Sequence, residues 1–207
     1  VAGRWHDRLD DPLKRLRDSA ADPHPRVRLE TIVAVSDVPH AASIVIASQA
    51  ADGPPDRFID FALTLAIHGL AEHWKPALIA GELKFAKSGH LTHVVSTYGG
   101  AELKPIIRQR AADHTMLTAY ASLATTAEVD WVLERGSGDV TVIRALEQAA
   151  RERNLKPSRN APAKLIKALD DKLNPARLAI IHLCSQWRLQ PTVMRIKRIA
   201  LDEKEPQ

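Results

Sequence analysis

A chain of 207 residues is long enough to bury a sizeable core, as one large domain or as two small ones. Hydrophobic residues make up 45% of the sequence, but aromatic residues only 4%, and there are 9 glycines. This composition favours closely packed helices and argues against a β-sandwich or β-barrel, which usually needs more glycine turns and more aromatic residues. The formal net charge of +4 can attract anionic partners, but it does not indicate a fold.

The distribution of charge and the single cysteine narrow the interpretation further. Residues 1–100 hold 11 Lys and Arg against 12 Asp and Glu, whereas residues 101–207 hold 18 against 13, so the excess positive charge lies in the second half. With Cys184 as the only cysteine, no intramolecular disulfide can form. No apolar run reaches the roughly 18 residues of a membrane-spanning helix. Because the sequence opens at Val1 without Met, we expect a processed protein or a segment of a longer one.

Prolines mark the starts of the predicted elements, because proline is tolerated in the first turn of a helix, where its missing N–H would have no partner. In Asp11-Pro12 and Asn174-Pro175 a good N-cap residue is followed directly by proline, so both pairs predict a helix start. Each apolar-periodic run predicts one helix. In chain order, we expect helices over residues 8–20, 25–36, 39–51, 55–72, 75–82, 88–98, 101–112, 114–125, 127–135, 139–154, 161–171, 174–188 and 191–203.

The spacing of these elements indicates a repeat. Between Pro12 and Pro55, successive helix-start prolines lie 13 to 16 residues apart, which is one helix and one short turn. Two such units make one repeat near the short end of the HEAT range, and a helical pair of this length must stack on its neighbours to bury its apolar face. We therefore predict an all-α fold: a single α-solenoid domain of about six HEAT-like helical pairs over residues 1–207, with a candidate break between sub-stacks at residues 154–162.

Two of the predicted helices are apolar nearly all round, and such helices are usually buried between neighbours. We therefore expect both to be sandwiched between neighbouring repeats. Their apolar residues are Phe58, Ile59, Phe61, Leu63, Leu65, Ile67 and Leu70 in the first helix, and Leu178, Ile180, Ile181, Leu183, Cys184 and Trp187 in the second.

The segment Asp22-Pro-His-Pro-Arg-Val-Arg28 is the clearest repeat signature. An acid, a gap of four and then Val-Arg at the start of an apolar helix is typical of the second helix in a HEAT-type repeat. We expect Asp22 to accept hydrogen bonds from the free N–H groups at the start of that helix, and Val27 to pack inward. We expect Arg28 to reach back toward the acid of its own or the adjacent turn. These three residues are therefore predicted to have structural roles.

Four motifs between Asp22 and Leu78 are more specific than a generic HEAT unit. They are His24-Pro-Arg-Val-Arg-Leu-Glu30, Pro39-His-Ala-Ala-Ser43, Asp56-Arg-Phe-Ile-Asp-Phe-Ala-Leu63 and Trp74-Lys-Pro-Ala-Leu78. This pattern resembles the helical-repeat region of large exported bacterial proteins described as membrane-bound-dehydrogenase-like or PVC-type haem-binding proteins, and the later Leu183-Cys-Ser-Gln-Trp-Arg-Leu189 resembles it too. In that family a sugar-dehydrogenase-like β-propeller comes first, the HEAT repeats follow, and a c-type haem domain usually closes the chain.

The resemblance implies only the repeat segment of such a protein. Haem attachment needs Cys-x-x-Cys-His, which one cysteine cannot supply, and no propeller strands are predicted. It therefore implies no redox chemistry and no cofactor for this chain itself. It implies a periplasmic or otherwise exported location, and a protein partner or the flanking domains of the parent chain as ligands. A single cysteine is equally compatible with a cytoplasmic location.

Histidines supply the one candidate for a metal site. His90-Leu-Thr-His93 places two imidazoles on one predicted helix face, with His68 and His73 nearby in sequence and His114 free to approach them in the fold. No acid or cysteine stands at ligand spacing beside them, so we predict surface or hydrogen-bonded histidines and no metal site.

The sequence contains no convincing active site, and we favour a non-catalytic role. Cys184 lies in the most apolar helix, and His182, two residues away, does not face it on a helix, so a buried and inert thiol is favoured over a nucleophile. No Gly-rich phosphate loop, nucleophile elbow or paired zinc motif is present. Asp130-Trp131 invites comparison with helical-repeat DNA glycosylases, which combine a basic concave face with aromatic and acidic groups.

The densest basic stretch is a candidate binding site for phosphate or acidic groups. A solvated face and loop is the alternative interpretation, which we prefer. Aromatic residues are not interleaved with the basic ones, so stacking of single-stranded bases is not indicated. The candidate binding residues are Arg151, Arg153, Lys156, Arg159, Lys164 and Lys167, followed by Lys172 and Arg177.

These observations predict a non-catalytic HEAT-repeat scaffold that binds protein partners, as a segment of a larger exported multidomain protein. Recognition would use the concave surface lined by the second helices of successive pairs. The alternative is an α-solenoid that binds nucleic acid or another polyanion, including a DNA glycosylase-like enzyme. A third interpretation is a regulatory module that shapes access to a neighbouring dehydrogenase or haem domain. If the basic residues of the second half lie on the concave face, they favour the polyanion-binding interpretation. If they lie on the convex face, they favour the scaffold interpretation.

Overall fold

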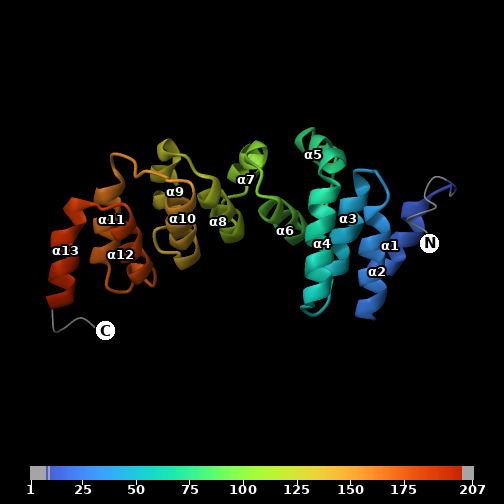
Figure 1. The fold of residues 1–207 in the computed structure, drawn as a ribbon, viewed down its shortest axis with the longest axis horizontal. Helices are drawn as coiled ribbons and strands as arrows, with labels where there is room; N and C mark the ends of the chain where they lie inside the picture. The colour runs from blue at the N-terminus through green and yellow to red at the C-terminus, as the bar shows by residue number, and fades with distance from the viewer. Residues whose placement is uncertain (1–7, 9, 202–207) are drawn as a thin grey trace. The chain divides into compact units, whose positions relative to one another are not determined.

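Helices are the only regular elements in the part of the chain that the computed structural model describes, residue 8 and residues 10–201 (Figure 1). The prediction of an all-α fold is therefore confirmed. Three short 3-10 helices lie in connections: η2 (Ala50–Asp52), η3 (Ala101–Leu103) and η4 (Thr126–Glu128). The α-helices are α1 (Pro12–Ala20), α2 (Pro25–Ser36), α3 (Ala42–Gln49), α4 (Arg57–Gly69), α5 (Ala71–Ile79), α6 (Ser88–Tyr98), α7 (Lys104–Gln109), α8 (His114–Leu123), α9 (Val129–Gly136), α10 (Val140–Glu152), α11 (Ala161–Asp170), α12 (Arg177–Gln186) and α13 (Gln190–Leu201).

Each predicted range overlaps an observed α-helix, the range 55–72 runs from α4 into the start of α5, and α2 and α6 have the predicted bounds. The helix start that Asp11-Pro12 predicts is observed, four residues after the start of the predicted range 8–20, whereas α12 begins at Arg177 and not at Pro175. The Asp11 carboxylate accepts a hydrogen bond from the Lys14 N–H (2.9 Å), and Pro12 occupies the first helical position. Local capping chemistry therefore sets this helix start.

The largest departure is α5, which begins at Ala71, so the prediction that a helix starts near Pro76 is wrong. Pro76 lies inside α5 instead. In α5, Trp74 is fully buried, and its indole N–H donates to the Ile67 carbonyl in the last turn of α4 (2.8 Å). This bond satisfies a helix-end carbonyl and holds the start of α5 against α4.

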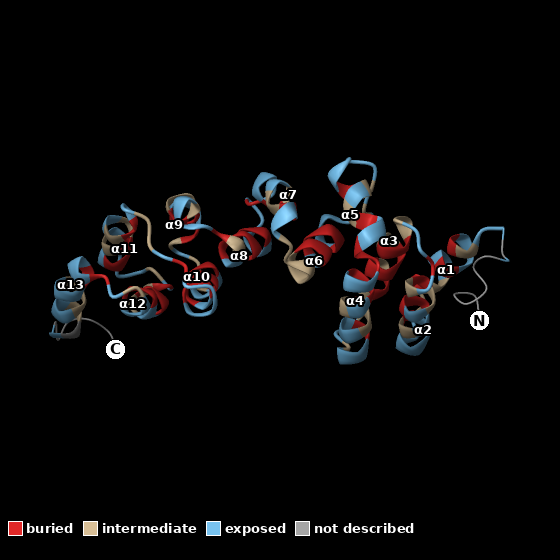
Figure 2. Cartoon of the chain, turned by 45° about the horizontal axis from the view of Figure 1, so that its top comes forward, coloured by how far each residue is buried: buried red, intermediate tan, exposed pale blue. Residues whose placement is uncertain are grey.

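The chain divides into two compact units, unit 1 (Val1–Gly99) and unit 2 (Gly100–Gln207). In unit 1, α2, α3 and α4 pack against one another, and helices two apart in sequence are also in contact: α1 with α3, α2 with α4, α3 with α5 and α4 with α6. The buried faces of these helices meet in one core, as Figure 2 shows. Its largest fully buried side chains are Trp74, Ile32, Ile44, Ile46, Leu63 and Ile67.

Unit 2 has the same alternation. The helices α8, α10 and α12 pack in succession, and α9, α11 and α13 pack in succession beside them. The result is two layers built from alternate helices, with side chains such as Met116, Leu133 and Ile143 fully buried between them. Gly136 allows close approach at this core, because a Cβ there would lie 2.5 Å from the Val142 side chain.

The prediction of one domain with a candidate break at residues 154–162 stays a prediction, but the structure places this loop within unit 2. The Trp187 indole N–H at the end of α12 donates to the Leu155 carbonyl (2.8 Å). The Asp130 carboxylate accepts hydrogen bonds from the Ser158 hydroxyl (2.7 Å) and the Asn160 amide (3.1 Å). These bonds tie the loop to α9 and α12.

Arg28 joins two inter-helix turns of unit 1. Its side chain is almost fully buried, at 5% exposure, and donates to the carbonyls of Asp22 (2.9 Å), Pro23 (3.1 Å) and Ala50 (3.1 Å). The guanidinium lies against Gly53, where an added Cβ would be 2.2 Å from Nη2. The predicted reach of Arg28 to the adjacent turn is therefore observed, although carbonyl groups accept its hydrogen bonds in place of a carboxylate.

The other two signature residues differ from their predicted roles. Val27 is 37% exposed, so the prediction that it packs inward is wrong. It lies one residue outside the buried stripe of α2, which follows the helical period. The Asp22 carboxylate accepts from the His24 N–H (2.7 Å), and His24 itself caps α2 by accepting from the Arg26 N–H (3.2 Å). The buried stripe consists of Arg28, Thr31, Ile32 and Val35.

We expect Arg28→Met to lower the free energy of unfolding by about 2–4 kcal/mol, because three carbonyls lose a buried charged donor. Gly53→Ala should cost about 1–2 kcal/mol in the wild-type protein, because the new methyl group displaces the guanidinium. The same Gly53→Ala change should cost little in the Arg28→Met background. Urea unfolding of the wild type, the two single variants and the double variant measures this coupling. An equal cost of Gly53→Ala in both backgrounds would show that close packing on Arg28 is not the cause.

Candidate functional site

The predicted basic stretch is divided among several structural contacts. Arg151 pairs with Glu147, and Lys164 with Glu134. Lys156 donates to the Asn154 side chain (2.7 Å). Arg151 and Lys164 are therefore partly neutralised by acids of unit 2, whereas the partner of Lys156 is a neutral amide.

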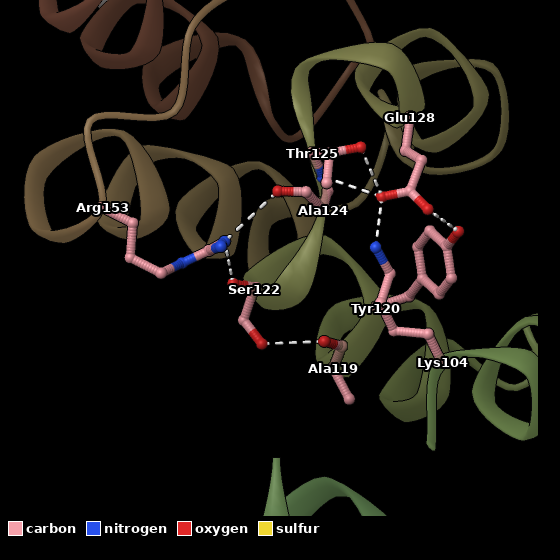
Figure 3. A network of polar contacts seen from close by, with 8 residues as sticks. All are labelled: Lys104, Ala119, Tyr120, Ser122, Ala124, Thr125, Glu128 and Arg153. Carbon is pink, nitrogen blue, oxygen red and sulfur yellow. Dashed lines mark hydrogen bonds and ion pairs between the residues drawn. The ribbon is translucent and has the colours of Figure 1, made fainter. Parts of the chain in front are cut away.

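Arg153 has an internal role that the sequence did not indicate. It follows the last residue of α10, and its guanidinium donates to the carbonyls of Ser122 and Ala124 at the end of α8 (Figure 3). These carbonyls have no partner within their own helix, so Arg153 acts as a cap supplied by another helix. Its position is explained by this contact without any ligand.

Lys164 and Lys167 are the two members of the stretch that share a surface hollow. The hollow has a volume of about 510 Å³ and lies between the end of α9, α11 and the connection to α12. Glu134 and Asp171 line it too, so its two cations face two acids. Arg159 is exposed on the loop and does not line this hollow. The structure therefore brings two of the six candidate residues together in a pocket, in a setting of mixed charge.

Glu128 is the centre of a polar network that joins α7, α8 and η4, shown in Figure 3. It pairs with Lys104 and accepts hydrogen bonds from the Tyr120 hydroxyl (2.7 Å), the Thr125 N–H (2.8 Å) and the Thr125 hydroxyl (2.8 Å). Burial alone would raise the pKa of the Glu128 carboxyl. The hydrogen bonds from Lys104, Thr125 and Tyr120 outweigh that effect and lower this pKa from 4.5 to about 2.

The Asp130-Trp131 pair is fully engaged within unit 2. The Asp130 carboxylate holds the loop residues Ser158 and Asn160. The guanidinium groups of Arg108 and Arg135 lie 4.9 and 4.2 Å from the Trp131 ring centroid, and the Tyr120 ring lies 4.8 Å away. The Arg contacts are cation–π interactions that fix the indole in place. The pair is thus accounted for by contacts that hold the helices and the loop together.

The two histidines are a hydrogen-bonded group and a surface group, as predicted. His90 is buried and its Nε2 lies 2.8 Å from Asp52, which also pairs with Lys87 (3.0 Å), whereas His93 is exposed. Burial opposes ionisation of Asp52, but the hydrogen bonds from His90 and Lys87 outweigh it and lower the pKa of this carboxyl below 3.8. Among the described residues, no group of three or more His, Cys, Asp or Glu side chains is placed to hold a metal ion.

Cys184 is buried at 2% exposure, as predicted. Burial raises the pKa of its thiol to about 11, against a smaller opposing effect of a hydrogen bond with Thr192. The thiolate is the reactive form of cysteine, so this thiol is a poor nucleophile at neutral pH.

The helix α4 exposes an apolar stripe, which we call the α4 stripe: Phe58 (57% exposed), Phe61 (65%) and Leu65 (57%). These residues are three and four positions apart and therefore lie on one face of the helix. The opposite positions, such as Leu63 and Ile67, are fully buried. The prediction that α4 is sandwiched between neighbours is therefore wrong on this face.

The surroundings of the α4 stripe extend the same surface. The Arg57 guanidinium lies 4.7 Å from the Phe58 ring centroid at one end. At the other end of α4, the exposed His68 ring lies 5.5 Å from the ring of Tyr98. The neighbouring helix α2, which packs against α4, exposes Val33 at 52%. Unit 1 thus presents apolar and aromatic groups on two adjacent helices.

Comparisons with protein-family models, curated proteins and solved structures found no match to this chain. The family resemblance therefore stays a prediction. Across the described residues, every helix is too short or too polar to cross a membrane.

We expect Glu128→Gln to destabilise the fold by about 1–2 kcal/mol at pH 7, after allowance for partial solvent screening. Because the pKa is lowered on folding, ionised Glu128 stabilises the native state above pH 4.5, and this contribution is lost as the pH falls toward about 2. The difference in unfolding free energy between wild type and variant should therefore shrink across this range.

Urea unfolding at a series of pH values measures this difference. Glu134→Gln is the matched control, because Glu134 also pairs with a lysine but is 57% exposed, so its loss should change stability little at any pH. A pH-independent deficit for Glu128→Gln would contradict the assigned role of its charge.

Proposed function

We propose that this chain is a non-catalytic α-solenoid of HEAT-like repeats that acts as a scaffold by binding a protein partner through the α4 stripe. The observation that carries the proposal is the exposure of Phe58, Phe61 and Leu65 on one face of a helix whose other face is fully buried. Exposed apolar stripes of this kind on an otherwise polar surface mark interaction sites. The proposed module belongs to a larger exported multidomain protein, as the family resemblance implies.

The composition of the chain strengthens this interpretation. The sequence holds only 3 Phe, 4 Trp and 2 Tyr, yet two of the three phenylalanines stand exposed on a single helix face. Aromatic side chains are enriched at the centres of protein interfaces, because they bury a large area at a small loss of conformational freedom. The α4 stripe therefore supplies anchor residues that fit a protein surface or an amphipathic helix.

The repeat architecture is supported by the packing within each unit. Helices two apart in sequence contact one another in both units, which is the arrangement expected when each helical pair stacks on its neighbour. The helix α4 carries the α4 stripe, and α2 carries the exposed Val33. The two helices are neighbours in one layer of unit 1. Second helices of successive pairs would line the binding face in the proposed solenoid.

We expect a photo-crosslinking amino acid at Phe61 or Leu65 to capture one discrete protein partner in the native host, because both side chains project from the α4 stripe. The same crosslinker at Arg144, an exposed position of α10, is the control and should capture none. Gel analysis and mass spectrometry of the adducts give the readout. Identical adducts from all three positions, or none from the stripe, would contradict the proposal.

A variant pair then separates binding from folding. Phe61→Asp should abolish capture from Leu65 while changing the unfolding free energy by only about 0.5 kcal/mol, since the side chain is exposed. Phe61→Leu, which keeps the surface apolar, should retain capture.

Polyanion binding is the competing function and has a direct test in a salt series. We expect the purified chain to bind duplex DNA no more tightly than about 10–100 µM at physiological salt, because most of the predicted basic stretch is engaged inside unit 2. Electrophoretic mobility shifts from low to high salt measure this. Sub-micromolar binding that falls steeply with salt would replace the scaffold proposal with a polyanion-binding one.

A further inference from the structure

An apolar groove lies in unit 2, between α12 and α13. Its volume is about 400 Å³, within the range of sites that hold ligands. On the α12 side it is lined by Ile181, Ser185 and Arg188, which follow one another at intervals of four and three residues. On the α13 side it is lined by Val193, Ile196 and Lys197, and Cys184, Leu189 and Thr192 form much of the floor.

The apolar surface continues beyond the groove. Leu178, one turn before Ile181 on the same side of α12, is 64% exposed. The prediction that α12 is sandwiched between neighbours is thus wrong on this face, as it is for one face of α4. Two helices therefore converge on an apolar trough that the described residues leave open.

The charges at the groove have one sign. Arg188 and Lys197 line it, both are exposed, and no acidic residue is among the lining residues. Among the described residues, neither cation has an ion pair, unlike Arg195 of the same helix, which pairs with Asp170. An occupant with an apolar face and acidic flanks would complement this groove, because it would cover the floor and neutralise both cations.

The shape of the groove points to a helical occupant. Its walls are two helix faces, each with lining residues at helical spacing over about two turns, or roughly 10 Å. The layers of unit 2 already show the packing that such a trough accepts, because α8, α10 and α12 lie against one another in succession. A further helix seated beside α12 and α13 would repeat this packing, with apolar residues at intervals of three and four as anchors.

We propose that the groove between α12 and α13 binds an acidic amphipathic helix of a partner protein. This site is separate from the α4 stripe, since the two lie in different units and share no residue. A second copy of the chain is a poor occupant. Among the described α-helices only α9 has more acidic than basic residues, and its Asp130 and Glu134 already contact Ser158 and Lys164.

The test uses the full chain and two synthetic peptides of about 14 residues, or roughly four helical turns. Both peptides carry leucines along one face, and the remaining positions are Glu in the acidic peptide and Lys in the basic one. Fluorescence anisotropy of labelled peptides gives the dissociation constants. We expect the acidic peptide to bind about tenfold more tightly than the basic one at low salt, and this ratio to fall as salt is added.

Three variants locate the binding. Val193→Asp places an acid on the groove wall at a position that is 36% exposed, and it should weaken binding of the acidic peptide by about tenfold or more. Lys197→Gln combined with Arg188→Gly should remove the preference for the acidic peptide. Arg188 has a left-handed backbone (φ 52°), which glycine adopts more readily, so this change should not unfold the site. Phe61→Asp on the α4 stripe is the matched control and should leave peptide binding unchanged.

Several results would overturn the proposal. They are equal affinity for both peptides, no binding of the acidic peptide, or no effect of Val193→Asp. Loss of binding in Phe61→Asp would move the site to α4. Analytical sedimentation gives one more check on the occupant. If the wild-type chain self-associates and Val193→Asp abolishes this self-association, the occupant is a second copy of the chain, and the proposal of a partner helix is refuted. Failure of this groove leaves the crosslinking result at the α4 stripe unaffected, so the two proposals are tested separately.

Discussion

The fold depends on one constraint: a helix of eight to thirteen residues, such as α3 or α4, cannot bury its apolar side by itself. Helices within each unit therefore pack against sequence neighbours, such as α2 against α3, or against the helix two positions away, such as α8 against α10, and the repetition of this pattern builds two layers. The same constraint explains the exposed apolar surfaces. A helix that is apolar on more faces than its neighbours can cover leaves one face open, and this is the state of α4 at Phe61 and of α12 at Leu178.

Stacked short helices have many ends, and the free carbonyls at those ends need donors. Long polar side chains from other helices meet this need. Arg28 reaches the carbonyls of two turns in unit 1, and Arg153 reaches the end of α8 from the end of α10. Asn174 does the same on a smaller scale, since its amide donates to the carbonyls of Ser137 and Ala168 (both 3.1 Å). A large share of the polar chemistry in this protein is therefore used to close its own turns.

The use of arginine and asparagine as internal caps explains what could and could not be predicted from sequence. Apolar periodicity and proline spacing place the helices well, because both are local properties. The role of Arg153 depends on a carbonyl about thirty residues away, and that of Asp52 on a histidine 38 residues away. The exposure of Phe58 and Phe61 depends on which faces the neighbouring helices cover. A sequence pattern shows that a helix is apolar all round, but only the packing shows which face is left open.

Three ionisable groups with shifted pKa values owe those shifts to burial and to contacts within the fold. A general acid or base works best with a pKa near the working pH, in reach of a bound substrate. Here the pKa values of Asp52 and Glu128 are lowered by hydrogen bonds and ion pairs that hold helices together, and the pKa of Cys184 is raised to about 11, so its thiol stays protonated. The apolar groups of α4 and α12, by contrast, are held on formed helices, so this chain loses little conformational freedom when a partner covers them. The energetics of the exposed surface thus suit binding, while those of the charged groups suit stability.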